Sequence, residues 1–177
     1  MQKKEIIVHI LEEMRSMCQL VEAHIDETEK VVNGSREEKN RDIVMRRAWT
    51  LLNTYYSWGG DDPSGIDCSG LMCELLQSVG IIGRKEDLTA QMLYNRFKSK
   101  KVDSPYRGCL VFWHSGTDLQ RIIHVEICID EDCAIGASGG GSRTLTKEQA
   151  IKDNAFVKIR TWRSRSRVYG FVDPFLR

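Results

Sequence analysis

The sequence has little of what marks disordered, membrane-spanning or exported chains. Only three prolines occur among 177 residues, which argues against disorder. No run approaches the ~20 apolar residues of a membrane-spanning helix, and charges scattered through the first 30 positions predict no secretory signal there. We therefore expect a soluble chain made in the cytoplasm. It would act outside the cell only after release by lysis, a virion or another delivery route.

Charge of one sign is also lacking, and so is a metal-binding cysteine pattern. Lys and Arg number 26 against 25 Asp and Glu, so nucleic acid is not an expected partner. The six cysteines include no C-x-x-C pair and accompany no signal peptide, so we expect reduced thiols, no metal and no cofactor. Most lie among apolar residues, where a thiol behaves as a small core side chain.

The length suits one buried domain with an appendage. Apolar positions at helical spacing predict an amphipathic helix over about residues 4–32, which Asn33-Gly34 would end. Ser35-Arg-Glu-Glu38 reads as a capping box that opens a second helix, so a helical hairpin is expected. We assign 1–34 to a helical extension and 35–177 to the main domain. The first helix either packs on its own domain or serves as a coiled-coil or partner-binding arm.

The rest of the chain changes from helical to strand patterns. A loop rich in turn residues over 55–65 precedes a helix that begins at Cys68, and a short helix with Thr89 as its cap is expected over 87–98. Five β-rich runs follow, at 109–113, 122–129, 133–135, 155–159 and 168–172. Helices followed by strands predict an α+β fold with an antiparallel sheet of about five strands.

Cys68 is the candidate nucleophile. A thiol in the first turn of a helix lies at the positive end of the helix dipole, which favours the thiolate. Its polar neighbours Asp67 and Ser69 also suggest an open site rather than a core position.

A cysteine nucleophile needs a base, usually histidine. His9 and His24 lie in the first helix, and His114 lies in a turn. His124 lies within a strand, where alternation puts it on one face with Glu126. We therefore take His124 as the base.

Four motifs make the sequence resemble the NlpC-like cell-wall cysteine peptidases over about residues 43–172. They are Tyr56-Ser-Trp-Gly-Gly60, Asp67-Cys-Ser-Gly-Leu71, Arg107-Gly-Cys-Leu-Val-Phe-Trp113 and His124-Val-Glu-Ile-Cys-Ile129. The resemblance implies a papain-like fold, Cys68 as nucleophile and His124 as base. It also implies hydrolysis of peptidoglycan stem peptides, typically between D-γ-glutamyl and the following diamino acid.

The same resemblance implies roles for three further residues. Tyr56 would line the site and help polarise the scissile carbonyl, and Asp67 and Ser69 would contact the stem peptide. The family's third catalytic position falls on Gly136, which has no side chain to orient an imidazole. We consider Ser138, backbone carbonyls of the glycine run 138–142, or Glu126 as substitutes, and favour Ser138 or the backbone over Glu126.

The biological setting and the substrate leave alternatives open. A phage tail or lysis component fits a peptidoglycan hydrolase without an export signal, and the first helix would then contact the delivery machinery. A Cys-His amidase or acyltransferase on another amide is a second reading, and a catalytically weakened peptide-binding module is a third. The arginines near the C-terminus suit an anionic polymer but more often form a solvated face; they are Arg160, Arg163, Arg165 and Arg167.

Overall fold

The computed structural model describes the backbone of residues 2–176 and the side chains of residues 14–22, 25, 28 and 36–176. The chain divides into two compact units, Met1–Lys39 and Asn40–Arg177. Helix α1, Gln2–Thr50, contributes to both of them. Within the described residues, no helix combines the length and the apolar character needed to cross a membrane.

The predicted helical hairpin is wrong, because α1 continues through Asn33 and Gly34. A glycine inside a helix costs only about 1 kcal/mol relative to alanine, so the residues around it can keep the helix going. In the first unit, the described apolar side chains of the predicted stripe are exposed, at Met14, Met17, Val21 and Ile25. The other predicted side chains lie outside the described residues, including Ile7, Ile10, Leu11, His9 and His24.

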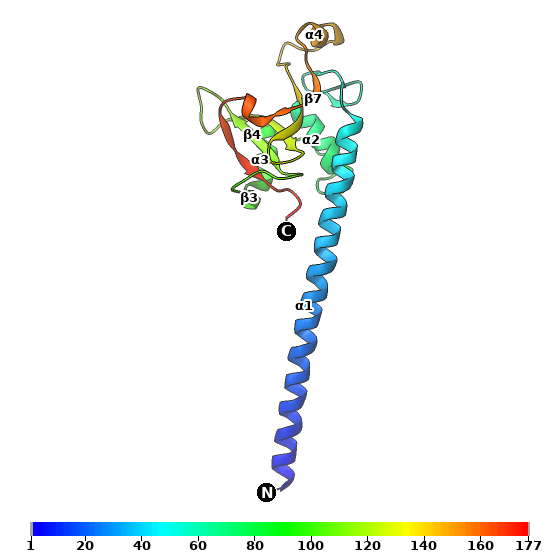
Figure 1. The fold of residues 1–177 in the computed structure, drawn as a ribbon, viewed down its shortest axis with the longest axis vertical. Coiled ribbons are helices and arrows are strands. Elements are labelled where there is room, and N and C mark those ends of the chain that lie inside the picture. The colour runs from blue at the N-terminus through cyan, green and yellow to red at the C-terminus, as the bar shows by residue number, and fades with distance from the viewer. Residues whose placement is uncertain (1, 177) are drawn as a thin grey trace. The chain divides into compact units, whose positions relative to one another are not determined.

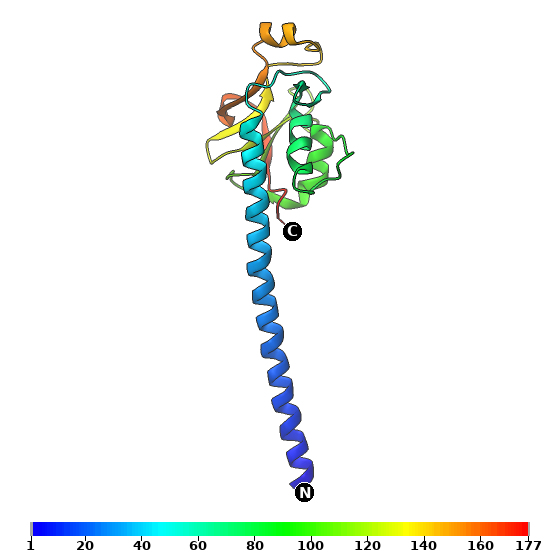
Figure 2. The same cartoon turned by 90° about the vertical axis from the view of Figure 1, so that its right-hand side faces the viewer.

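The helices of the second unit mostly follow the sequence prediction. Helix α2, Cys68–Gln77, begins where expected, and α3, Ala90–Phe97, is capped by Thr89. Figure 2 shows these two helices, in green, side by side against the sheet. The short helix α4, Lys147–Lys152, is not among the predicted elements, although Thr146 and Gln149 form a capping box at its start.

The sheet has six antiparallel strands in the order β3-β8-β4-β5-β6-β7. Figure 1 labels three of them, β3, β4 and β7. The α+β fold is confirmed, with one strand more than the expected five. The additional strand is β3, whose two residues are too few to give an alternating pattern. The strands are β3 Lys101–Val102, β4 Leu110–His114, β5 Ile122–Cys128, β6 Cys133–Ser138, β7 Phe156–Thr161 and β8 Val168–Val172.

Three smaller features complete the second unit. Strands β1 and β2, Asp61–Asp62 and Gly65–Ile66, form a separate two-stranded ribbon in the loop before α2. Short 3-10 helices η1 and η2 span Lys98–Lys100 and Trp162–Ser164.

Alternation along the central strands gives the sheet two different faces. Leu110, Phe112, Val125 and Ile127 belong to the main core, together with buried residues of α2 and α3. The intervening residues Trp113, His124 and Glu126 lie on the opposite face, where Trp113 pairs with His124 across β4 and β5. His124 and Glu126 are therefore buried on the sheet face opposite the main core.

Candidate active site

Asp67 fixes the start of α2 and with it the position of Cys68. Its Oδ1 accepts hydrogen bonds from the backbone N–H of Ser69 at 2.9 Å and of Gly70 at 2.8 Å, the arrangement of a helix N-cap. Its Oδ2 accepts from the N–H of Gly59 at 2.9 Å. One carboxylate thus joins the glycine-rich loop to the helix and holds Cys68 at the first helical position.

The loop approaches the helix too closely for any side chain at residue 70. A Cβ on Gly70 would lie 2.1 Å from the carbonyl oxygen of Gly60. Glycine is therefore required two residues after the nucleophile, because the loop backbone crosses the first turn of α2 there.

Cys68 is buried, with only 8% of its surface exposed. Burial, followed by the negative charge of Asp67, raises the pKa of Cys68 to about 12, although hydrogen bonds from the backbone of Val125 and Ser69 act in the other direction. The expectation of an open site is therefore wrong, because Cys68 is buried. Desolvation of the charged form opposes the effect of the helix dipole, and the thiolate stays a prediction.

The start of α2 reaches the strand that carries His124. The backbone of Val125, the residue after His124, hydrogen-bonds to Cys68, so the start of α2 reaches β5 at the predicted base. His124 is 6% exposed, and its ring lies 5.2 Å from that of Trp113. Burial lowers the pKa of His124 despite the opposing effect of Glu126, so the imidazole rests in its neutral form.

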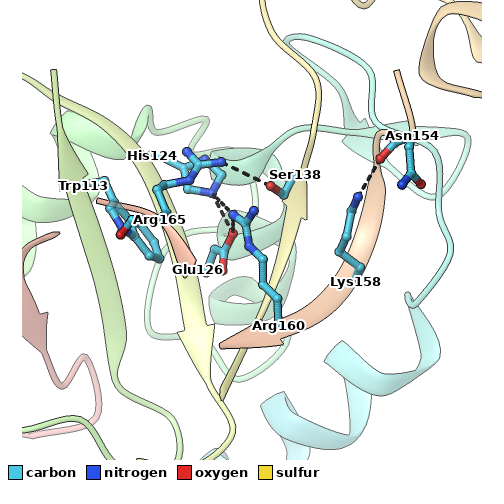
Figure 3. Close-up of polar contacts among 8 residues, drawn as sticks. All are labelled: Trp113, His124, Glu126, Ser138, Asn154, Lys158, Arg160 and Arg165. Atoms are coloured by element: carbon cyan, nitrogen blue, oxygen red, sulfur yellow. Dashed lines mark hydrogen bonds and ion pairs between the residues drawn. The ribbon is translucent and has the colours of Figure 1, made fainter. Parts of the chain in front are cut away.

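Glu126 is the partner of the His124 ring. His124 Nε2 lies 2.8 Å from Glu126 Oε1, and the same oxygen accepts from Arg160 Nη2 (Figure 3). Burial alone would raise the pKa of Glu126, but the hydrogen bonds and charges of His124 and Arg160 hold it below its usual range. The carboxylate is therefore ionised and shared between an imidazole and a guanidinium.

The hydrogen bond that we favoured from the sequence, between Ser138 and His124, is not the one formed. Ser138 Oγ instead accepts from Arg165 Nη2 at 3.2 Å (Figure 3). Glu126 takes the ring because its side chain can reach two residues back along the same face of its own strand. A catalytic role for Ser138 stays a prediction.

The predicted substrate-binding residues all lie around Cys68. Tyr56 is buried; burial, followed by the charges of Cys68 and Asp67, raises the pKa of its hydroxyl, which therefore stays protonated and able to donate. Ser69 Oγ donates to Asp67 at 2.9 Å, so both residues already form part of the helix cap. Direct contacts of these three residues with substrate stay predictions.

Sequence reasoning missed Arg160 and Arg165 as residues of the site. The sequence pattern predicts a solvated basic face for both of them together with Arg163 and Arg167, and only the latter two are exposed. Arg160 pairs with Ala134 on β6, and sequence spacing alone does not give this register. No cluster of three or more His, Cys, Asp or Glu side chains suited to a metal ion occurs among the residues described.

A cysteine at the start of a helix and a histidine on an antiparallel sheet are the two elements of the site that the sequence motifs predict. The model of the NlpC/P60 family matches residues 53–162, well over half of the chain, and the chain belongs to this family. Members of the family are cysteine peptidases or peptidoglycan hydrolases.

A curated relative shares part of this region. Dipeptidyl-peptidase 6 of Lysinibacillus sphaericus is 32% identical over 108 residues, which is 60% of this chain and 35% of that protein. The chain thus spans about a third of that relative's length.

Solved structures share the fold at lower identity. The NlpC/p60 domain of the peptidoglycan hydrolase SagA is 23% identical with a TM-score of 0.54, covering 75% of this chain and 97% of that one. The peptidoglycan hydrolase RipB of Mycobacterium tuberculosis is 21% identical with a TM-score of 0.58, covering 81% and 68% respectively. These likenesses establish the papain-like fold expected from the sequence.

Proposed function

We propose that the chain is a cysteine endopeptidase that hydrolyses peptidoglycan stem peptides, at the bond between D-γ-glutamyl and the following diamino acid. The observation that carries this proposal is the placement of Cys68 at the start of α2, hydrogen-bonded to the backbone next to His124. Membership of the NlpC/P60 family and likeness to peptidoglycan hydrolases support the choice of substrate. The position of the cleaved bond rests on the resemblance of the motifs alone.

The first half of the reaction acylates the cysteine. His124 takes the proton of Cys68, and the thiolate attacks the scissile carbonyl to form a tetrahedral intermediate. Asp67 already binds the N–H groups of Ser69 and Gly70, so the N–H of Cys68 and the Tyr56 hydroxyl are the donors for the oxyanion. Protonated His124 then gives its proton to the leaving amine, and the C–N bond breaks.

The second half regenerates the thiol. His124, now neutral, takes a proton from water, and the resulting hydroxide attacks the thioester carbonyl. The C–S bond breaks, the peptide acid leaves, and Cys68 recovers its proton from His124. Every proton taken from the thiol or the water is returned, so the cycle needs no metal or redox partner.

The test is incubation of purified peptidoglycan with the protein and with its Cys68→Ala and Cys68→Ser variants. Released fragments are identified by mass spectrometry, which also names the bond. We expect fragments from the native protein and none from either variant, with unchanged circular dichroism. Unchanged peptidoglycan with rapid alkylation of Cys68 would instead favour a Cys-His amidase or acyltransferase on another amide. An inert Cys68 would favour a peptide-binding module.

The setting of the activity is also a proposal. We expect action on the cell wall after release or as part of a virion, with residues 1–34 contacting phage tail or other delivery machinery. The exposed apolar side chains of Met14, Met17 and Val21 support a contact role for this segment.

A further inference from the structure

A buried carboxylate lies between the base and an arginine in the middle of the sheet. Glu126 has no exposed surface, and Oε1 contacts both His124 on its own strand and Arg160 on β7. Figure 3 shows these three side chains converging from β5 and β7, with Ser138 turned to Arg165 instead. The three side chains form a continuous polar chain from β7 to the imidazole.

The geometry fixes the direction of the hydrogen bond at His124. Nε2 lies 2.8 Å from the ionised Glu126 but 3.5 Å from Arg160 Nη2. A carboxylate can only accept, and one ring nitrogen cannot donate to Glu126 and accept from Arg160 at the same time. The shorter contact decides that Nε2 carries the proton. In a neutral imidazole this leaves Nδ1 as the unprotonated nitrogen, the one available to act as a base.

Gly136 on β6 provides the space for this carboxylate. The register that pairs Ile127 with Ile135 continues to place Gly136 opposite Glu126. A Cβ at residue 136 would lie 2.2 Å from Glu126 Cγ and 2.8 Å from its Oε1. The backbone of Gly136 does not have the positive φ that favours glycine, so packing alone excludes a side chain there.

The arrangement is poorly suited to a purely structural role. Among the described residues, Glu126 Oε2 and Arg160 Nε are buried without a hydrogen-bond partner. Buried ion pairs with unmet hydrogen bonds add little stability compared with apolar residues of similar volume. A group that contributes little to stability yet contacts the base directly points to a role in catalysis.

We propose that Glu126, held in place by Arg160, is the positioning residue of His124 and selects the tautomer in which Nδ1 carries no proton. Gly136 has no side chain and so leaves the space that the Glu126 side chain occupies. This inference rests on the proposed function, because it assigns His124 as the base. It replaces Ser138 as the favoured partner of the ring. It also explains how the His124 ring can be oriented although residue 136 is a glycine, which has no side chain for that purpose.

The experiment exchanges the carboxylate between the two strands. Glu126→Gln removes the charge while keeping the shape. Glu126→Gly combined with Gly136→Asp moves a carboxylate from β5 to β6. A Cβ on residue 136 would lie 2.8 Å from the present position of Glu126 Oε1, and the two bonds from Cβ to an aspartate oxygen span a similar distance. Lys158→Gln is the matched control, because Lys158 is a β7 cation that pairs with Gly136 and bonds Asn154 (Figure 3).

Two readouts are compared for each variant. The first is kcat and KM on peptidoglycan fragments. The second is the ¹⁵N chemical shift of the His124 ring nitrogens, which reports the tautomer without substrate. We expect Glu126→Gln to lower kcat about 100-fold or more with little change in KM, and to lose the pure Nε2-protonated signature. Glu126→Gly and Gly136→Asp should each be impaired alone, and their combination should recover roughly tenfold or more over either. Lys158→Gln should stay within about twofold of the native protein.

The outcomes separate this inference from the proposed function. Native kcat and an unchanged tautomer in folded Glu126→Gln would overturn the role of Glu126. So would a combined variant that folds but recovers neither activity nor the Nε2-protonated signal. If the native protein cleaves no peptidoglycan, the proposed function fails, while the ring-nitrogen shifts still decide whether Glu126 sets the state of His124.

Discussion

Replacing Asp67 should have opposite effects on the stability of the fold and on the reactivity of Cys68. The carboxylate accepts three backbone hydrogen bonds and one from the Ser69 hydroxyl. Loss of an N-cap side chain costs about 0.5–2 kcal/mol, and loss of a hydrogen bond to a charged group about 1.5–3 kcal/mol. These contributions are not additive, and we expect Asp67→Ala to lower the free energy of unfolding by about 3 kcal/mol. Asp67→Asn keeps one acceptor oxygen and should lose about half of that.

The same carboxylate opposes ionisation of the neighbouring thiol. After burial, the charge of Asp67 is the largest cause that raises the pKa of Cys68. Its removal should lower that pKa and increase the thiolate fraction at neutral pH. We therefore expect Asp67→Asn to be less stable than the native protein but to alkylate faster at Cys68.

Two assays test this pair of effects. Urea unfolding followed by circular dichroism gives the free energy of unfolding, and a loss of about 3 kcal/mol corresponds to roughly 10 °C in Tm. Alkylation by iodoacetamide is followed peptide by peptide in the mass spectrometer, because Cys18 is exposed and also reacts. The reasoning is refuted if Asp67→Ala unfolds within about 0.5 kcal/mol of the native protein and only KM rises. Asp67 would then be a substrate ligand rather than the organiser of α2.

Three further predictions concern the whole fold. Arg41→Ala should lower the urea midpoint by an amount equivalent to about 3 kcal/mol, because it leaves the buried Asp173 carboxylate without its 3.0 Å ion pair; a loss below about 1 kcal/mol would contradict this. Removal of residues 1–39 should leave the free energy of unfolding and the alkylation of Cys68 unchanged, because Arg41 is the first buried residue among the side chains of α1 that the structure describes; aggregation or loss of the cooperative transition would count against it. The pKa values of Cys68 and Cys73 are raised, mainly by burial, to about 12 and about 11, so both thiols stabilise the fold below about pH 9 and lose that effect as the pH rises through the folded values. The urea midpoint should therefore fall between pH 8 and pH 10.5, and less steeply in Cys73→Ala.

The parts of the fold that can be predicted from the sequence are those marked by local signals such as helix caps. Helix α2 begins at Cys68 because Asp67 caps it, and α3 follows Thr89 for the same reason. The hairpin failed because Asn33-Gly34 is only a weak break, whose small cost the surrounding helix tolerates.

The residues of the candidate site can be predicted from the sequence, but the contacts between neighbouring strands that determine their partners cannot. Motifs gave Cys68 and His124, and alternation placed Glu126 on the face of His124. Which group bonds the ring depends on the space that Gly136 leaves across the β5–β6 register, and sequence spacing does not show this. The burial of Cys68 does not follow from the sequence for a related reason, since the segments that cover it are distant in sequence.

The contact between Glu126 and Gly136 also limits the order in which mutations can accumulate at this site. Side chains at both positions would occupy the same volume, since a Cβ on residue 136 would fall within the Glu126 side chain. A lineage that moves the polar group from one strand to the other must first lose it from the strand it occupies. The intermediate, with glycine at both positions, packs without a clash but leaves His124 without its partner. Because the proposed role of Glu126 would be lost in that intermediate, we expect the polar group to stay on the strand that now carries it.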